Sequence, residues 1–323
     1  MAAFRFAHLS DPHLPLAAGR PALGLLASKR LLGYLSWRRK RHRIHRPDVL
    51  AAMLADIQAY APDHRVVTGD LVNIALPDEF VRARDWLETV GTPEDVTLIP
   101  GNHDATVTFP WADGLGLWRD WMAGDGCLPA EGGEGPESLF PAVRVRGPVA
   151  FVGLSTAVPT LPLLATGRLG EAQLARAESV LADLGRRGLY RVVLLHHPPV
   201  EAHWGQKHGG ERKALTDRRA FQAMLGRVGA ELVLHGHTHC ARLTSIKGPA
   251  ASIPALAVPS ASAAPSSKGD TARWHLYAVE RIGDAWRLEV TAREWTPEGF
   301  ATAGRYTVEM PAVDAPAAVS TAS

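Results

Sequence analysis

Side chains that can bind metals gather in five short clusters, each directly after an apolar run of the sequence. The clusters are Asp11-Pro12-His13, Gly69-Asp70, Gly101-Asn102-His103-Asp104, His196-His197 and Gly236-His237-Thr238-His239. Carboxylate oxygens, amide oxygens and imidazole nitrogens are atoms with which proteins bind divalent first-row metals. Asp11 and His13 are two residues apart, as are His237 and His239, so each pair points to one side of an extended chain. The spacing predicts two chelating pairs.

The number of donors indicates more than one metal ion. A mononuclear catalytic site usually takes three protein ligands and keeps an open position. These clusters offer seven candidate donors, more than such a site takes: two aspartates, one asparagine and four histidines. Two metals that share a carboxylate lie roughly 3.5–4 Å apart and clamp the attacking and leaving oxygens of a displacement at phosphorus. The donor set therefore favours a dinuclear centre for phosphoryl chemistry.

Taken in order, the clusters resemble the motif set of the calcineurin-like metallophosphoesterase superfamily: D-x-H, GD, GNH[DE], H and GHxH. The resemblance covers roughly residues 4 to 240, and every motif is present. It implies an α/β fold, a four-layer α/β-β-α sandwich of two mixed sheets flanked by helices. It also implies two bound metal ions (Mn, Fe or Zn) and hydrolysis of a phosphoester by a hydroxide that bridges them.

Matched motif by motif, the resemblance implies seven metal ligands: Asp11, His13 and His239 for the first ion, Asn102, His196 and His237 for the second, and Asp70 as the bridge. His103 is expected to stabilise the transition state or protonate the leaving group, each effect being roughly 10²–10⁴-fold. Asp104 is expected to hold the His103 ring. The remaining polar neighbours are interpreted as structural or supporting: His8, His197 and His235 in packing or supporting roles, and Asn73 as a candidate support for the bridging carboxylate.

Strands and helices alternate along most of the chain. Short apolar runs at 4–9, 65–68, 96–99, 149–154, 191–195 and 231–234 are predicted strands. Helical apolar spacing lies between many of them, at 47–60, 77–90, 170–187 and 216–228. Segments 243–258 and 275–295 are strand-like with no helix between them. This order predicts an α/β sandwich, in which ligands collect at the carboxyl ends of the strands.

Length and composition favour one large domain. The 323 residues include 46% hydrophobic residues, enough for a sizeable core, and we expect a single domain at 1–310 with a disordered tail at 311–323. No apolar stretch approaches the roughly 20 residues of a membrane span. The N-terminus lacks a signal-peptide pattern, and two cysteines in unrelated contexts fit a reducing cytosol. We therefore expect a cytoplasmic protein.

The net charge of +2 conceals a strongly basic segment. Residues 29–46 hold eight Lys or Arg and no acid, which leaves −6 for the rest of the chain. They belong to a basic insert at about 14–46, whose leucines and cations alternate as in an amphipathic helix. Three interpretations stay open: a cap that grips an anionic substrate, a helix that lies on an anionic membrane through residues 20–46, or a solvated helix packed on the domain by its leucines. Nucleic-acid binding is disfavoured, because no second basic patch with interleaved aromatics is present.

The loop after His196 is a candidate substrate lid, since residues 198–215 combine glycines with cations. Within it His203, Lys207 and Arg212 are predicted phosphate contacts. The leading hypothesis is a metal-dependent phosphodiesterase acting on a small phosphoester, and its diester preference rests on similarity to bacterial cyclic-nucleotide and glycerophosphodiester hydrolases. The alternatives are a hydrolase of a phospholipid or nucleotide-lipid at the inner face of the membrane, and a non-catalytic scaffold.

Overall fold

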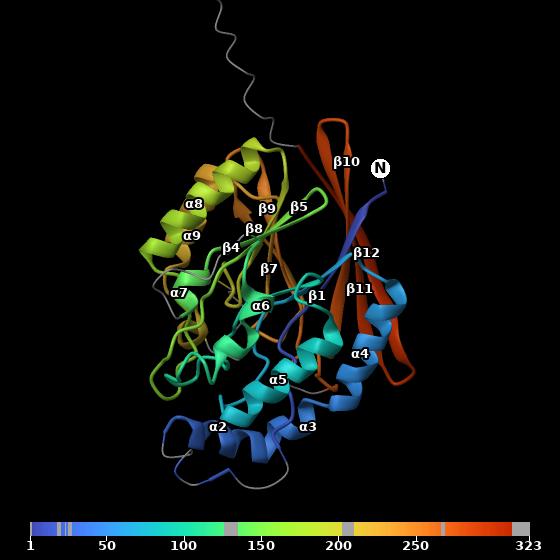
Figure 1. The fold of residues 1–323 in the computed structure, drawn as a ribbon. Coiled ribbons are helices and arrows are strands. Elements are labelled where there is room, and N and C mark those ends of the chain that lie inside the picture. Colours follow the sequence, from blue (N-terminus) through green and yellow to red (C-terminus); the bar gives the residue numbers. More distant parts are fainter. Residues whose placement is uncertain are drawn as a thin grey trace, which may run out of the picture.

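The computed structural model describes residues 2–17, 21–22, 24, 28–125, 135–201, 210–265 and 269–311, so nearly all of the predicted tail lies outside the described residues. Within these residues, two sheets pack face to face, and helices cover both outer faces (Figure 1). The arrangement confirms the predicted four-layer α/β-β-α sandwich. None of the described helices is long and apolar enough to cross a membrane.

The first sheet carries three parallel strands next to an antiparallel meander. Its described strands, in spatial order, are β12 (Gly299–Pro311), β11 (Ala285–Thr296), β10 (Arg273–Ile282), β1 (Phe4–Leu9), β2 (His64–Val67) and β3 (Val96–Leu98). Two helices cover its outer face, α4 (Pro47–Tyr60) and α5 (Pro77–Val90) (Figure 1). Both begin with proline, whose missing N–H costs nothing at the first turn, and both have the predicted bounds.

The second sheet is parallel in its middle and antiparallel at both edges. Its described strands, in spatial order, are β4 (Ala142–Arg146), β5 (Val149–Gly153), β6 (Tyr190–Leu194), β7 (Leu232–His235), β9 (Ser252–Ala257) and β8 (Arg242–Lys247). Two helices cover it, α8 (Glu171–Arg186) and α9 (Arg218–Val228). Short helices fill the connections: η2 (Leu115–Trp118), α6 (Arg119–Met122), α7 (Pro136–Leu139) and η4 (Gly210–Lys213).

An aromatic core joins the two sheets. Phe6 of β1 stacks on Tyr277 of β10 with ring centroids 4.8 Å apart, and its edge meets Phe151 of β5 at 5.1 Å. All three side chains are fully buried. Contacts of this kind fix one sheet against the other. The loops at the carboxyl ends of the strands are thereby held in register across the sandwich.

The basic insert forms a helical rod beside that end of the sandwich. Its described part contains α2 (Arg30–Ser36), the π-helical η1 (Trp37–Arg41) and α3 (His42–Ile44), with helical backbone at the junctions. Arg30 donates to the carbonyls of Ile74 and Ala75, and Tyr34 is buried. Leu31, Leu32 and Leu35, by contrast, are exposed. The interpretation of a helix packed by its leucines is therefore wrong for these three residues.

Candidate metal centre

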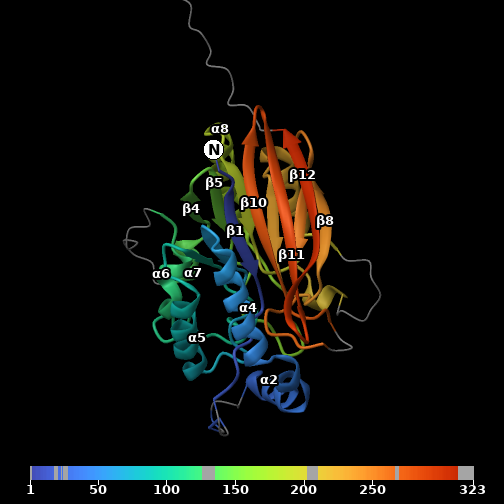
Figure 2. The same cartoon turned by 90° about the vertical axis from the view of Figure 1, so that its right-hand side faces the viewer.

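The loops after β1, β2, β3, β6 and β7 bring the predicted ligands together across the two sheets. One hydrogen bond joins the His196 ring after β6 to the Thr68 carbonyl after β2, at 2.7 Å. Another runs from the His237 backbone N–H after β7 to the Asp11 carboxylate after β1, at 3.0 Å. Figures 1 and 2 place α2 at the same end as the carboxyl end of β1. The site is built from both sheets.

Three overlapping sets of donor atoms, each within 4.8 Å of one another, can hold metal ions: Asp11, His13 and Asp70; Asp70, His196 and His237; and His13, His45 and His239. Asp70 belongs to two of these sets. Its Oδ2 lies 3.3 Å from Nε2 of His196 and 3.8 Å from Nε2 of His13. Asn102 joins them, with Oδ1 3.2 Å from the same His196 nitrogen. All seven predicted ligands therefore belong to one connected cluster, in which Asp70 is shared by two of the sets.

The imidazoles are oriented as metal ligands would be. Nδ1 of His196 donates to the Thr68 carbonyl, and Nδ1 of His13 donates to the Val72 carbonyl at 3.2 Å. Because a carbonyl only accepts, the hydrogen-bonding proton lies on Nδ1. The other ring nitrogen, Nε2, therefore faces the cluster as the atom available to a metal ion. Nε2 of His13 lies 3.2 Å from Nε2 of His239. Nitrogens that face each other and two carboxylates fit bound metal ions.

Burial and neighbouring charges shift the pKa values of Asp70, His196 and Asp104. Burial alone would raise the pKa of Asp70 and lower that of His196, yet their mutual attraction reverses both effects. The pKa of Asp70 is held well below its usual range, and that of His196 rises to about 10. Burial and the Asp70 charge raise the pKa of Asp104 to about 7. A metal that binds here would displace the proton of His196, since metal ligands must be deprotonated.

Backbone strain is concentrated at the same residues. Eight described non-glycine residues have positive φ, and five of them are predicted ligands. These five, with φ between 41° and 69°, are Asp11, His13, Asp70, His237 and His239. Each such conformation costs on the order of 1–3 kcal/mol and persists where the surroundings enforce it, often at functional sites. A Cβ on Gly101 would collide with the Asp70 carboxylate, which explains the glycine there.

The predicted role of Asp104 is wrong. Its carboxylate does not contact the His103 ring but accepts hydrogen bonds from the backbone N–H groups of Gly101 and Asp70, both at 2.8 Å, and of Val72 at 3.1 Å. It therefore clamps the loop after β2 to the loop after β3. This clamp fixes the backbone that carries Asp70.

The His103 ring is held by a backbone carbonyl instead. Its Nδ1 donates to the carbonyl of Asn73 at 2.6 Å, so Nε2 is left as an acceptor. Burial and the positive charge of Arg41 lower the pKa of His103 to about 3, so the ring is neutral. Asn73 therefore supports His103 through its carbonyl, while its side chain donates to the Leu14 carbonyl and not to Asp70.

Arg41 is a site residue that the motifs did not identify. Its Nη1 lies 3.2 Å from Nε2 of His103, and its Nη2 lies 3.1 Å from Nε2 of His13. Arg41 ends the π-helical segment, a rare geometry that is frequent at functional sites. Desolvation lowers the pKa of Arg41, and the charges of Asp70 and Asp11 oppose it. Among the described residues, no carboxylate lies at ion-pair distance from its guanidinium.

His45 is a second residue from the basic insert that reaches the centre. Hydroxyls of Ser260 and Ser262 lie 3.2 and 3.0 Å from its Nδ1. Its ring centroid is 4.5 Å from that of His13 and 5.6 Å from that of His239. The chain must return from His13, after β1, to the start of α4 at Pro47, and this constraint was the available sequence signal for His45.

The predicted phosphate contacts differ in what the structure shows. His203 and Lys207 lie outside the described residues. Arg212 is exposed in η4, where its carbonyl accepts a hydrogen bond from Ala165. Desolvation and the charge of Arg41 lower the pKa of the adjacent Lys213, while the charges of Asp11 and Asp70 act in the opposite direction. Lys213 therefore interacts electrostatically with charged residues of the centre.

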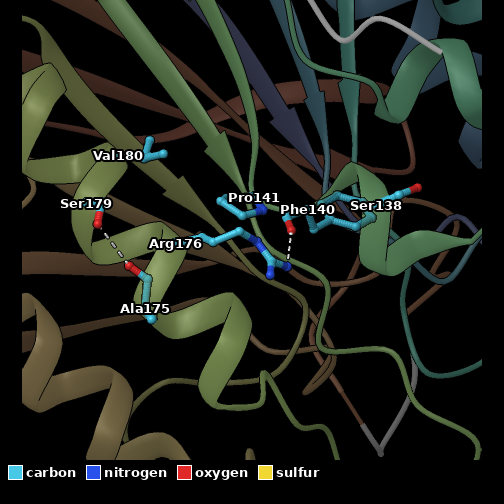
Figure 3. Close-up of a pocket in the computed structure, with 7 residues that line it drawn as sticks. All are labelled: Ser138, Phe140, Pro141, Ala175, Arg176, Ser179 and Val180. Atoms are coloured by element: carbon cyan, nitrogen blue, oxygen red, sulfur yellow. Dashed lines mark hydrogen bonds between the residues drawn. The ribbon is translucent and has the colours of Figure 1, made fainter. Parts of the chain in front are cut away.

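The histidines interpreted as structural make structural contacts. His8 bonds to the Thr68 hydroxyl at 2.9 Å, and His197 to the Thr156 hydroxyl at 2.7 Å. His235 is buried at the end of β7. A separate pocket lies between α7 and α8 and contains none of the predicted site residues (Figure 3). Its one arginine, Arg176, donates to the carbonyl of Phe140 at 2.9 Å.

Comparisons with known proteins agree with this geometry. Glycerophosphodiester phosphodiesterase GpdQ of Enterobacter lignolyticus (strain SCF1) is 31% identical over 140 residues, which span 43% of this chain and 43% of the relative. Purple acid phosphatase PPD1 from yellow lupin (Lupinus luteus) seeds has a TM-score of 0.60 at 14% identity, over 95% of this chain and 53% of the lupin chain. The chain thus spans about half the lupin enzyme, with which it shares the fold.

The family comparison covers most of the sequence. Residues 4–241 match the family model described as calcineurin-like phosphoesterase. This range contains the five clusters and the basic insert, and it ends just after His239. The chain belongs to the calcineurin-like phosphoesterase family.

Proposed function

We propose that the chain is a metal-dependent phosphodiesterase with a dinuclear centre. The observation that carries the proposal is the position of Asp70, whose carboxylate is shared by two sets of metal-binding donors. The donor set divides as follows: Asp11, His13 and His239 for one ion, Asn102, His196 and His237 for the other, and Asp70 between them. Metal ions held by these residues would supply a nucleophile near neutral pH and would stabilise charge on the phosphoryl oxygens.

Arg41 binds the phosphoryl group of the substrate in this proposal. Its guanidinium lies beside His13 and His103 and has no carboxylate partner at ion-pair distance among the described residues. A desolvated, unpaired guanidinium gains most from an anion that accepts two parallel hydrogen bonds, as a phosphoester does. His103 accepts from Arg41 and is fixed by Asn73, so it acts as a positioning residue for the guanidinium.

The diester preference is the finer part of the proposal. It is supported by the likeness to a glycerophosphodiester phosphodiesterase, which is 31% identical over 140 residues.

The test compares bis(p-nitrophenyl) phosphate with p-nitrophenyl phosphate on protein reconstituted with Mn²⁺, Fe²⁺ or Zn²⁺. We expect metal-dependent release of p-nitrophenol, with the higher kcat/KM for the diester, and loss of both activities in Asp70→Asn. A higher kcat/KM for the monoester would refute the diester preference. Absence of turnover with either substrate, in protein that binds metal, would favour the scaffold alternative.

A further inference from the structure

The outer side of α2 carries leucines that the core does not use. Leu31, Leu32 and Leu35 are 43%, 45% and 38% exposed. The inner side is already occupied, because Gly33 packs so closely on Ile74 that a Cβ would overlap it. The helix therefore cannot turn its leucines inward without losing this contact.

A turn that contacts the start of α2 carries two more exposed leucines. Leu161 and Leu163 are 72% and 73% exposed, and Leu163 has φ 67°, which is rare for a bulky residue. The ammonium group of Lys29, next to α2, donates to the Thr160 hydroxyl at 2.5 Å and to the Leu164 carbonyl at 2.8 Å. Lys29 thus holds the turn against the start of the helix.

We call the five side chains the leucine surface: Leu31, Leu32, Leu35, Leu161 and Leu163. They are five of the eight large hydrophobic side chains that are exposed in the described part of the chain. Single exposed leucines are ordinary, but five on two adjacent elements mark an interaction site. The leucine surface is therefore the main unburied apolar feature of the described residues.

Cations follow the leucine surface along the same rod. Arg38, Arg39, Lys40 and Arg43 are exposed, and none of them forms an ion pair with a carboxylate of the described residues. The sequence has no acid between residues 29 and 46. The rod therefore presents an apolar face and an unneutralised positive charge side by side.

We infer that this rod and turn dock the protein on an anionic lipid bilayer. Leucines that enter the acyl boundary and cations that meet lipid phosphates are the two contributions that bind an amphipathic helix to a membrane. A nucleic acid would use the cations and leave the leucines exposed. The lipid surface accounts for both features.

Sedimentation of the full chain with vesicles tests the inference without any turnover, so its result is independent of the proposed hydrolysis. We expect binding to vesicles that contain phosphatidylglycerol and much weaker binding to pure phosphatidylcholine. The double variant Leu32→Glu/Leu161→Glu should bind at least about tenfold more weakly, because two leucine side chains that enter the bilayer are lost. Arg38→Gln/Arg39→Gln should lose roughly fivefold per cation.

The matched control is Leu243→Glu/Ile282→Glu, which changes two exposed apolar residues on β8 and β10. It should bind vesicles as the unchanged protein does. The inference is overturned if the unchanged protein does not sediment with anionic vesicles, or if the control loses as much binding as Leu32→Glu/Leu161→Glu. Tighter binding to duplex DNA that is unaffected by the leucine variant would also overturn it.

Discussion

Two groups of buried histidines lie in this molecule, and they differ in their partners. His13 and His196 follow strands, and their Nε2 atoms lie 3.8 and 3.3 Å from a carboxylate oxygen of Asp70. His64 and His275 lie within β2 and β10, where their partners are the hydroxyls of Thr97 at 2.7 Å and Tyr277 at 3.1 Å. No described carboxylate lies at ion-pair distance from these two strand histidines.

The difference shows that burial alone does not mark a metal ligand. Burial lowers the pKa of His64 and of His275 to about 3, whereas the Asp70 charge raises that of His196 to about 10. An unpartnered ring nitrogen does not discriminate either, since both His64 and His237 have one. The histidines of the candidate metal centre differ from the strand histidines because carboxylates and other imidazoles lie beside them at the strand ends.

The sharpest test of the comparison is Asp70→Asn set against His64→Gln. The first substitution removes the shared carboxylate, and we expect kcat/KM for the diester to fall by roughly 10³-fold or more, because metal ions supply several kcal/mol of transition-state stabilisation. The second should leave kcat/KM within about twofold, since substitutions away from the reacting atoms leave transition-state binding intact. Steady-state kinetics with saturating Mn²⁺ measure both. Equal losses would break the distinction.

Arg41→Ala should have the next largest effect. Loss of a charge aimed at the phosphoryl oxygens costs on the order of 10²–10³-fold in kcat. Arg41→Lys should recover only part of it, because an ammonium group cannot form the paired hydrogen bonds of a guanidinium. Metal content should stay unchanged in both variants. An unchanged kcat in Arg41→Ala would show that the guanidinium does not act on the substrate.

Asp104→Asn tests the clamp between the two loops. The carboxylate accepts three backbone N–H bonds, and an amide oxygen accepts them more weakly while its NH₂ group repels a donor. We expect metal affinity to fall about 10–100-fold, as for other groups that orient ligands. Titration of metal-free protein with Mn²⁺ provides the measurement. Unchanged affinity would show that the loops hold their shape without the clamp.

Acid pH should destabilise the fold through the strand histidines. His64 has a pKa of about 3 in the fold and an ordinary value of 6.5 when unfolded. Stability is therefore fully present above pH 6.5 and is lost as the pH falls toward 3, at up to about 1.4 kcal/mol per pH unit for each such histidine. His64→Gln should flatten this slope in denaturant unfolding of metal-free protein. An unchanged slope would assign the acid sensitivity to other groups.

The sequence predicted the scaffold and the cluster of candidate ligands that the structure brings together, because both have local signatures. Apolar runs gave β1, β5 and β6, and proline gave the starts of α4 and α5. The edge strand β4 was missed because Arg144 and Arg146 break its apolar run, although the Arg144 guanidinium is buried on the carbonyls of Ala123 and Val96.

What the sequence could not provide depends on three-dimensional contacts. The position of Arg41 follows from a π-helical segment, and the clamp of Asp104 depends on backbone groups from two loops. Neither leaves a trace in the residue pattern. The amphipathic pattern of the basic insert predicted a helix but not which face is buried. Tyr34 and Gly33 face the domain, so the leucines are exposed.

The most direct test of Asp70 as a shared ligand is the metal content of the reconstituted protein by mass spectrometry. We expect two metal ions per chain in the unchanged protein and in His64→Gln, and at most one in Asp70→Asn. Fewer than one ion in the unchanged protein, or two ions retained in Asp70→Asn, would contradict it.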